Sequence, residues 1–366
     1  MAIPSLPDPQ APAASAWRVC VAPMMDWTDR HCRYFHRLIT RRARLYTEMA
    51  TTGALLHGDL PRHLDFNAEE HPLALQLGGS EPHDLARCAK LAQQWGYDEI
   101  NLNCGCPSER VQRGAFGACL MAEPQLVRDC VAAMRDAASL PVTVKHRIGI
   151  DRAEDYAFVR DFVGTVSEGG CSVFVVHARN AWLKGLSPRQ NREVPPLRHE
   201  WVVQLKRDFP GFIFVVNGGI ATIEQIVDQL GRVDGVMVGR AAYHDPWSMA
   251  AWDVRCLEAA DAAATDRDAV ESAMIDYMER EATRHATPWP AIARHMLGLR
   301  HGTPGARRWR QVWSDHRLKS VAPREVGMRA QRALQGGKLE VHTMEELACQ
   351  PKNAEMNPRR SSIPTT

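Results

Sequence analysis

The sequence predicts an α/β protein, a (β/α)8 barrel of the TIM type followed by a smaller all-helical C-terminal domain. Eight short apolar runs alternate with helical patterns, as in repeated βα units around a parallel sheet. Eight such units within about 240 residues fit a closed barrel better than an open, doubly wound sheet. After Trp252 no further strand-like run occurs and helical patterns take over.

Each apolar run has the length of a strand and is bounded by glycine, proline or polar residues. The expected strands cover residues 18–22, 44–48, 73–77, 99–103, 142–145, 172–177, 212–217 and 235–239. Apolar residues at helical spacing predict helices over 82–94, 123–138, 153–167, 223–230, 269–285, 289–299 and 306–317. We therefore expect a barrel domain over 17–254 and a helical domain over 255–345.

The two ends of the chain lack periodic apolar patterns. Residues 1–16 are rich in proline and alanine without the features of a secretory signal, which predicts a flexible extension, and residues 346–366 are expected to be a disordered tail. No run approaches the roughly 20 apolar residues that span a bilayer, so we expect no membrane partner. The sequence favours a cytoplasmic monomer.

The ten cysteines include no Cys-x-x-Cys pair, and we expect reduced thiols, most of them in the core. A zinc site built from Cys104, Cys106 and Cys119 is an alternative, but this spacing fits no common structural pattern. The sequence therefore predicts no bound metal.

Positive charge is concentrated near the C-terminus. Residues 284–332 contain eleven lysines and arginines but only Asp315 and Glu325 as acids, although the formal net charge of the chain is only +2. Such asymmetry indicates a polyanion-binding module on a neutral or acidic body. A solvated helical face would have the same composition.

The residues that follow the expected strands are the candidates for the active site, because barrels of this type place it at the C-terminal strand ends. The candidates are Pro23, Met24, Met25, Gln76, Asn103, Cys106, Lys145, His177, Arg179, Asn217, Gly218, Gly219, Gly239 and Arg240. Glycines after the seventh and eighth strands favour a phosphate site, although Gly-Gly also makes ordinary turns.

Lys145 fits either a Schiff-base nucleophile or the partner of an anion. Met24, Met25 and Gln76 favour the second role, because they suit a planar heterocycle such as a flavin. Cys106 lies between Gly105 and Pro107, which favours a sharp, extended turn. A thiol there is mostly protonated near neutral pH and can act as an acid, whereas a cysteine in the core would be inert.

Six segments carry a resemblance to a known family. They read Ala-Pro-Met-Met-Asp at 22–26, Asn-Leu-Asn-Cys-Gly-Cys-Pro-Ser at 101–108, Val-Lys-His-Arg-Ile-Gly at 144–149, Val-His-Ala-Arg at 176–179, Asn-Gly-Gly at 217–219 with Gly-Arg at 239–240, and Gly-Thr-Pro-Gly-Ala-Arg-Arg-Trp at 302–309. In these segments the chain resembles the tRNA-dihydrouridine synthases, specifically their DusA-type subfamily.

The resemblance implies a flavin enzyme that uses NADPH to reduce uridines 20 and 20a in the tRNA D-loop. It implies that FMN is bound by Pro23, Met24, Met25, Gln76, Lys145, His177, Asn217, Gly218, Gly219, Gly239 and Arg240. Hydride would reach C6 of a flipped uracil, Cys106 would protonate C5, and Asn103 would orient the base. The expected tRNA contacts are Arg179, Lys184, Arg189, Asn191, Arg192, Arg300, Arg307 and Arg308.

Two other functions stay open at this point. One is a flavin barrel that acts on a free pyrimidine or another small molecule, which would not need a basic helical part. The other is a non-catalytic RNA-binding protein on a degenerate barrel, which would bind no flavin.

Overall fold

The computed structural model describes residues 14–108, 114–153, 155–257 and 265–336. At its centre lies one parallel sheet of eight strands in the order β1-β8-β7-β6-β5-β4-β3-β2. The strands are β1 (Val19–Val21), β2 (Leu45–Thr51), β3 (Leu73–Gly78), β4 (Glu99–Cys104), β5 (Val142–Arg147), β6 (Val173–His177), β7 (Ile213–Asn217) and β8 (Gly235–Val238). Hydrogen bonds from Val21 N to Arg44 O (2.9 Å) and from Arg44 N to Val19 O (3.0 Å) close the sheet into a barrel. The predicted fold is confirmed.

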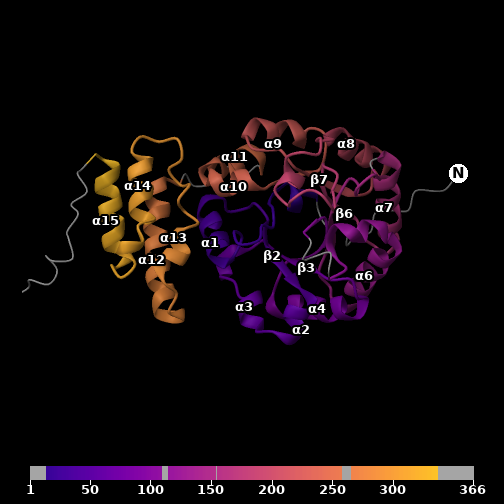
Figure 1. Cartoon of the computed structure of the whole chain (residues 1–366), viewed down its shortest axis with the longest axis horizontal. Helices are drawn as coiled ribbons and strands as arrows, with labels where there is room; N and C mark the ends of the chain where they lie inside the picture. Colours follow the sequence, from indigo (N-terminus) through magenta and orange to yellow (C-terminus); the bar gives the residue numbers. More distant parts are fainter. Residues whose placement is uncertain (1–13, 109–113, 154, 258–264, 337–366) are drawn as a thin grey trace, which may run out of the picture.

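Helices surround the barrel between successive strands (Figure 1). They are α1 (Arg30–Ile39), α2 (Thr52–His57), α3 (Leu60–Leu64), α4 (Pro82–Trp95), α6 (Pro124–Ala137), α7 (Tyr156–Glu168), α8 (His199–Asp208), α9 (Ile223–Leu230), α10 (Arg240–His244) and α11 (Trp252–Cys256). All eight predicted strands and the four predicted barrel helices are present, with ends within three residues of those expected. Residues 1–13 and 337–366, which include most of the expected extension and the whole expected tail, lie outside the described residues.

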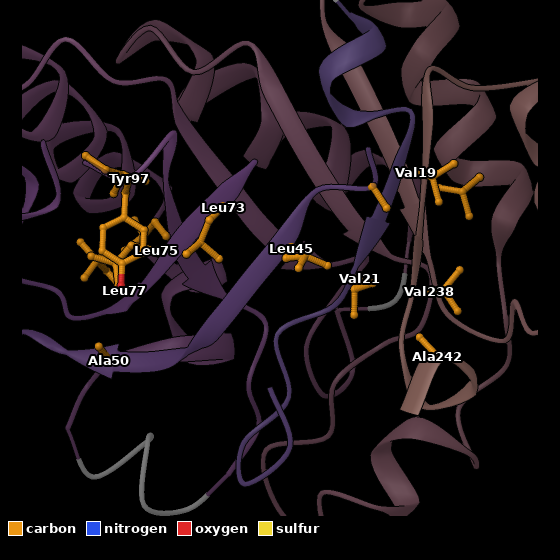
Figure 2. Close-up of a cluster of buried hydrophobic side chains, with 14 of the residues drawn as sticks. Val19, Val21, Leu45, Ala50, Leu73, Leu75, Leu77, Tyr97, Val238 and Ala242 are labelled. Carbon is orange, nitrogen blue, oxygen red and sulfur yellow. The ribbon is translucent and has the colours of Figure 1, made fainter. Parts of the chain in front are cut away.

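The strands alternate between two apolar cores, because successive side chains point to opposite faces. The outer core lies between strands and helices and includes Leu73, Leu75 and Leu77 of β3 (Figure 2). The inner core fills the barrel and includes Ala74 of the same strand and Met237 of β8. Full burial of one such leucine contributes about 1.5–3 kcal/mol.

The C-terminal part of the structure is a helical bundle (residues 265–336) that packs beside α1 (Figure 1). Its helices are α12 (Arg267–His285), α13 (Trp289–Ala293), α14 (Ala306–Trp313) and α15 (Pro323–Leu334). Tyr277 of α12 stacks on Tyr34 of α1 with ring centroids 4.0 Å apart. The bundle is thus joined to the barrel through aromatic packing.

Two predicted helices of the bundle are shorter than expected. The helix predicted over 289–299 ends at Ala293, and the chain then turns so that Gly298 packs against the backbone of His244; a Cβ on Gly298 would lie 2.6 Å from the His244 carbonyl oxygen. The helix predicted over 306–317 ends at Trp313, because Asp315 caps a separate short turn by accepting the Arg317 N–H.

Glu271 of α12 organises the interior of the bundle. Its carboxylate accepts hydrogen bonds from the indoles of Trp309 (2.8 Å) and Trp313 (2.9 Å) and pairs with the buried guanidinium of Arg300 (2.8 Å). These partners come from α14 and from the segment that precedes it, so one buried carboxylate on α12 ties these parts of the bundle together.

We expect Glu271→Ala to lower the free energy of unfolding by about 3–5 kcal/mol, because it leaves the Arg300 charge buried without its main partner. Glu279→Ala is the matched control on the same helix. It removes only an exposed ion pair with Arg324 and should cost less than about 1 kcal/mol. Urea unfolding followed by tryptophan fluorescence measures both, and equal midpoints for the two variants would contradict this role of Glu271.

Candidate active site

The turn after β4 presents Cys106 at the mouth of the barrel. The side-chain oxygen of Asn103 accepts the backbone N–H groups of Gly105 and Cys106, both at 3.0 Å, which bends the chain sharply. Cys106 is partly exposed, whereas Cys104 is fully buried in the outer core. The two cysteines therefore occupy different environments.

A ladder of buried polar side chains supports this turn from inside the barrel. Asn103 Nδ2 donates to Gln76 Oε1 (2.9 Å), Gln76 Nε2 donates to Asn101 Oδ1 (2.8 Å), and Asn101 Nδ2 donates to Thr143 Oγ1 (2.7 Å). The Thr143 hydroxyl in turn donates to Glu99 (2.5 Å). Glu99 also accepts from Trp17 (2.7 Å) and Tyr46 (2.9 Å) and pairs with Arg44 (3.1 Å). The ladder thus runs from the buried Glu99 carboxylate to the cysteine turn.

Lys145 and His177 lie on neighbouring strands, β5 and β6, and are half-buried. Burial lowers the pKa of Lys145 to about 8, with a further contribution from Arg147. Burial and the charges of Arg147 and Lys145 hold the pKa of His177 well below its usual range, so the imidazole is neutral. Among the described residues, none forms a hydrogen bond with the Lys145 ammonium. A half-buried ammonium group that lacks a hydrogen-bond partner among the described residues suits an electron-rich ligand.

Arg147 at the end of β5 is a residue to which the sequence analysis assigned no role. Its Nε donates to Gly105 O (3.1 Å), and Nη1 donates to the carbonyls of Asn180 (3.3 Å) and Asn191 (2.9 Å). It therefore ties the cysteine turn to the loop after β6. Its position two residues after Lys145, on the same strand face, is the signal that could have identified it.

At the exit of β7, neighbouring side chains pack so closely against the backbone that only glycine fits. Gly218 (φ 111°) and Gly219 (φ 71°) both adopt backbone conformations that favour glycine. A Cβ on Gly218 would lie 2.7 Å from His177, and one on Gly219 would lie 2.4 Å from Leu197. Asn217, just before them, is buried and donates to Met237 O (2.7 Å). We call the turn at Gly218 and Gly219 the glycine cradle. Together with Lys145 and neutral His177, it suits a flat cofactor that bears a phosphate.

Arg240, directly after Gly239 and β8, is exposed and forms an ion pair with Glu193 of the loop after β6 (2.6 Å). Burial and the nearby charge of Arg240 lower the pKa values of Arg179 and Arg192. The loop after β6 and the start of α10 therefore bring three arginines and one compensating carboxylate to the same side of the mouth.

The β1 exit adds an apolar edge to the mouth. Pro23 and Met24 are half-buried, and Met25 is 56% exposed. Thr28 holds this turn, because its hydroxyl accepts the Met24 N–H (2.9 Å). Among the expected flavin ligands, Gln76 is buried, with 2% of its surface exposed, and it belongs to the ladder below the mouth. The other expected ligands lie at or near the strand ends.

The structure corrects two of the expected RNA contacts. Asn191 is fully buried, and its amide donates to the backbone carbonyls of its own loop, for example to Trp182 O (2.9 Å). Arg300 is 6% exposed and pairs with Glu271. Both side chains are used to hold the protein together and are not available to a phosphate.

The remaining expected RNA contacts reach the surface. Lys184, Arg189, Arg192, Arg307 and Arg308 are exposed, and Arg179 is half-buried. Arg308 has a second task, because its Nε donates to Ala333 O (2.7 Å) near the end of α15.

The described residues contain no group of three or more histidine, cysteine or acidic side chains placed to hold a metal ion. None of their helices has the length and apolarity needed to cross a membrane.

Comparisons with known proteins agree with the geometry of the mouth. The sequence model of the family described as Dihydrouridine synthase (Dus) matches residues 20–335. The chain belongs to the dihydrouridine synthase family. It is similar to the tRNA-dihydrouridine(20/20a) synthase of Salmonella typhi, with 56% identity over 321 residues, which is 87% of this chain and 96% of the relative. The enzymes of the same name from Escherichia coli K12 and Pseudomonas putida are 57% and 55% identical over 83% and 87% of this chain, which cover 88% and 94% of those relatives.

This dihydrouridine synthase homologue should show a pH signature of Lys145. Its pKa falls from a usual 10.5 to about 8 on folding, so between these values the unfolded chain binds more protons. The free energy of unfolding should therefore contain a Lys145 contribution that increases with pH across that window. Lys145→Met should lack this increase. Urea unfolding of the flavin-free wild-type and Lys145→Met proteins at about pH 7.5 and about pH 9.5 measures the difference. An equal change in the free energy of unfolding for both proteins would exclude a lowered pKa of Lys145.

Proposed function

We propose that this chain is a cytoplasmic tRNA-dihydrouridine(20/20a) synthase that reduces the C5–C6 bond of uridine in the tRNA D-loop with FMN and NADPH. The observation that carries the proposal is the partly exposed Cys106, held by Asn103 at a barrel mouth that also contains Lys145, His177 and a glycine cradle. Membership of the family and relatives of that name over most of the chain support it.

Gly218, Gly219 and the Gly239-Arg240 turn would hold the phosphate of FMN through their backbone. Met24 and Met25 at the β1 exit would offer apolar contact to its ring. Lys145 would supply a positive charge to the electron-rich edge of the ring. When bound and reduced by NADPH, FMN supplies a hydride to C6 of uracil.

Cys106 would complete the reduction by giving its thiol proton to C5 of the same base, which keeps the product neutral. The turn suits this role, because Asn103 accepts the N–H and Arg147 donates to the carbonyl of the single peptide group that joins Gly105 to Cys106. One Asn103 amide hydrogen is used by Gln76, and the second is the group that would orient the uracil.

The base must leave its stack to reach this depth, which is the usual requirement for chemistry on a nucleobase. Exposed cations on the β6 loop and on α14 would neutralise phosphates of the bound tRNA; they are Lys184, Arg189, Arg192 and Arg307. A free-pyrimidine reductase would not require these contacts.

Cys106→Ala should bind flavin and oxidise NADPH but form at least about 100-fold less dihydrouridine, because the general acid is missing. Cys104→Ala is the control, since that thiol is buried in the outer core. Mass spectrometry of tRNA incubated with each purified variant gives the product. Normal product formation by Cys106→Ala would refute the assignment of the proton donor.

Arg307→Glu should weaken tRNA binding and lower the slope of log affinity against log salt by about one. Arg307 is chosen over Arg308 because charge reversal at Arg308 would also break its hydrogen bond to Ala333 O in α15. Filter binding at several salt concentrations measures the slope, and flavin content should be unchanged. Unaltered affinity and slope would place the tRNA surface elsewhere, and absence of any tRNA binding by the wild-type protein would favour a free small-molecule substrate.

A further inference from the structure

The turn after β1 contains a backbone residue whose conformation needs support. Asp26 has φ 65°, in the left-handed region that costs a non-glycine residue about 1 kcal/mol or more. It directly follows Met25, which edges the mouth of the barrel. A residue in this conformation persists only where its surroundings hold it.

Side chains from two distant elements hold the two peptide groups of Asp26. Glu48, in β2, accepts its N–H through Oε1. Arg294, which follows α13 in the helical bundle, donates from Nη1 to its carbonyl oxygen (2.8 Å). The contacts are 22 and 268 residues apart in sequence, so neither follows from local turn geometry.

Arg294 is also fixed in place. Its Nη2 pairs with Asp29 Oδ2 (2.6 Å), and the buried ring of His295 contacts the same oxygen (3.0 Å). Asp29 caps α1 by accepting the N–H groups of His31 and Cys32. The guanidinium therefore has a defined orientation although its side chain is 43% exposed.

We propose that Glu48 and Arg294 are positioning residues that clamp the Asp26 backbone from opposite sides and thereby set Met24 and Met25 against the flavin. The inference rests on the proposed function, because it requires a flavin at the mouth. It gives the helical bundle a part in building the cofactor site, in addition to any contact with RNA.

The test uses the purified flavin-bound protein without RNA, and it follows the recovery of free-flavin fluorescence after dilution. Arg294→Ala should release flavin about tenfold faster and shift its visible absorption, because a charge-assisted hydrogen bond to the turn is lost. Glu48→Ala should act in the same direction, whereas Glu48→Gln keeps an acceptor oxygen and should restore near wild-type release. The double variant Glu48→Ala with Arg294→Ala should release flavin more slowly than the product of the two single effects predicts, since both side chains hold one turn.

Arg310→Ala is the matched control, because it removes an exposed arginine from the same bundle and should leave flavin release unchanged. Arg294→Lys, which cannot reach Asp26 and Asp29 together, should lie between wild type and alanine. Wild-type release and spectrum in Arg294→Ala and Glu48→Ala would overturn the clamp alone. A wild-type protein that carries no flavin would overturn the proposed function and the clamp together.

Discussion

The carboxylate of Glu99 sets the direction of the hydrogen bonds in the ladder that leads to the active-site turn. It pairs with Arg44 and accepts from Thr143, and the Thr143 oxygen in turn accepts from the amide of Asn101. Gln76 likewise donates to Asn101 and accepts from the amide of Asn103. The side-chain oxygen of Asn103 is therefore free to accept from the backbone of the cysteine turn. A carboxamide has its donor on one side and its acceptor on the other, so each amide in the ladder has a single productive orientation.

Sequence reasoning reached the parts of this arrangement that depend on local pattern. Alternating apolar residues determine which strand faces are buried, and polar residues at strand ends must then face the mouth. This is why Cys106, Lys145 and His177 could be placed at the mouth from the sequence. The links between strands could not be predicted in the same way. Arg147 and Gly105 are 42 residues apart, and nothing near either residue indicates the contact.

The charge of the helical bundle shows how a sequence window can mislead. Residues 284–332 exclude nearly all of α12, which supplies the acidic partners of several arginines, including Glu271 for Arg300 and Glu279 for Arg324. Over residues 265–336 the chain has thirteen lysines and arginines against eight acidic residues, so the positive surplus is smaller than the shorter window indicated. The residue type alone could not separate a buried structural arginine such as Arg300 from an exposed one such as Arg307.

The outer apolar core does not stop where the barrel ends. One connected set of buried side chains runs from β3 through Phe35 of α1 to Met274 of α12 and Trp313 of α14. Removal of the bundle would expose the apolar side of α1 to water, at a cost that rises with the uncovered area. We therefore expect the barrel and the bundle to unfold together, and the bundle to be a poor candidate for exchange between proteins by itself. A change in this region of either part would have to be matched by a change in the other.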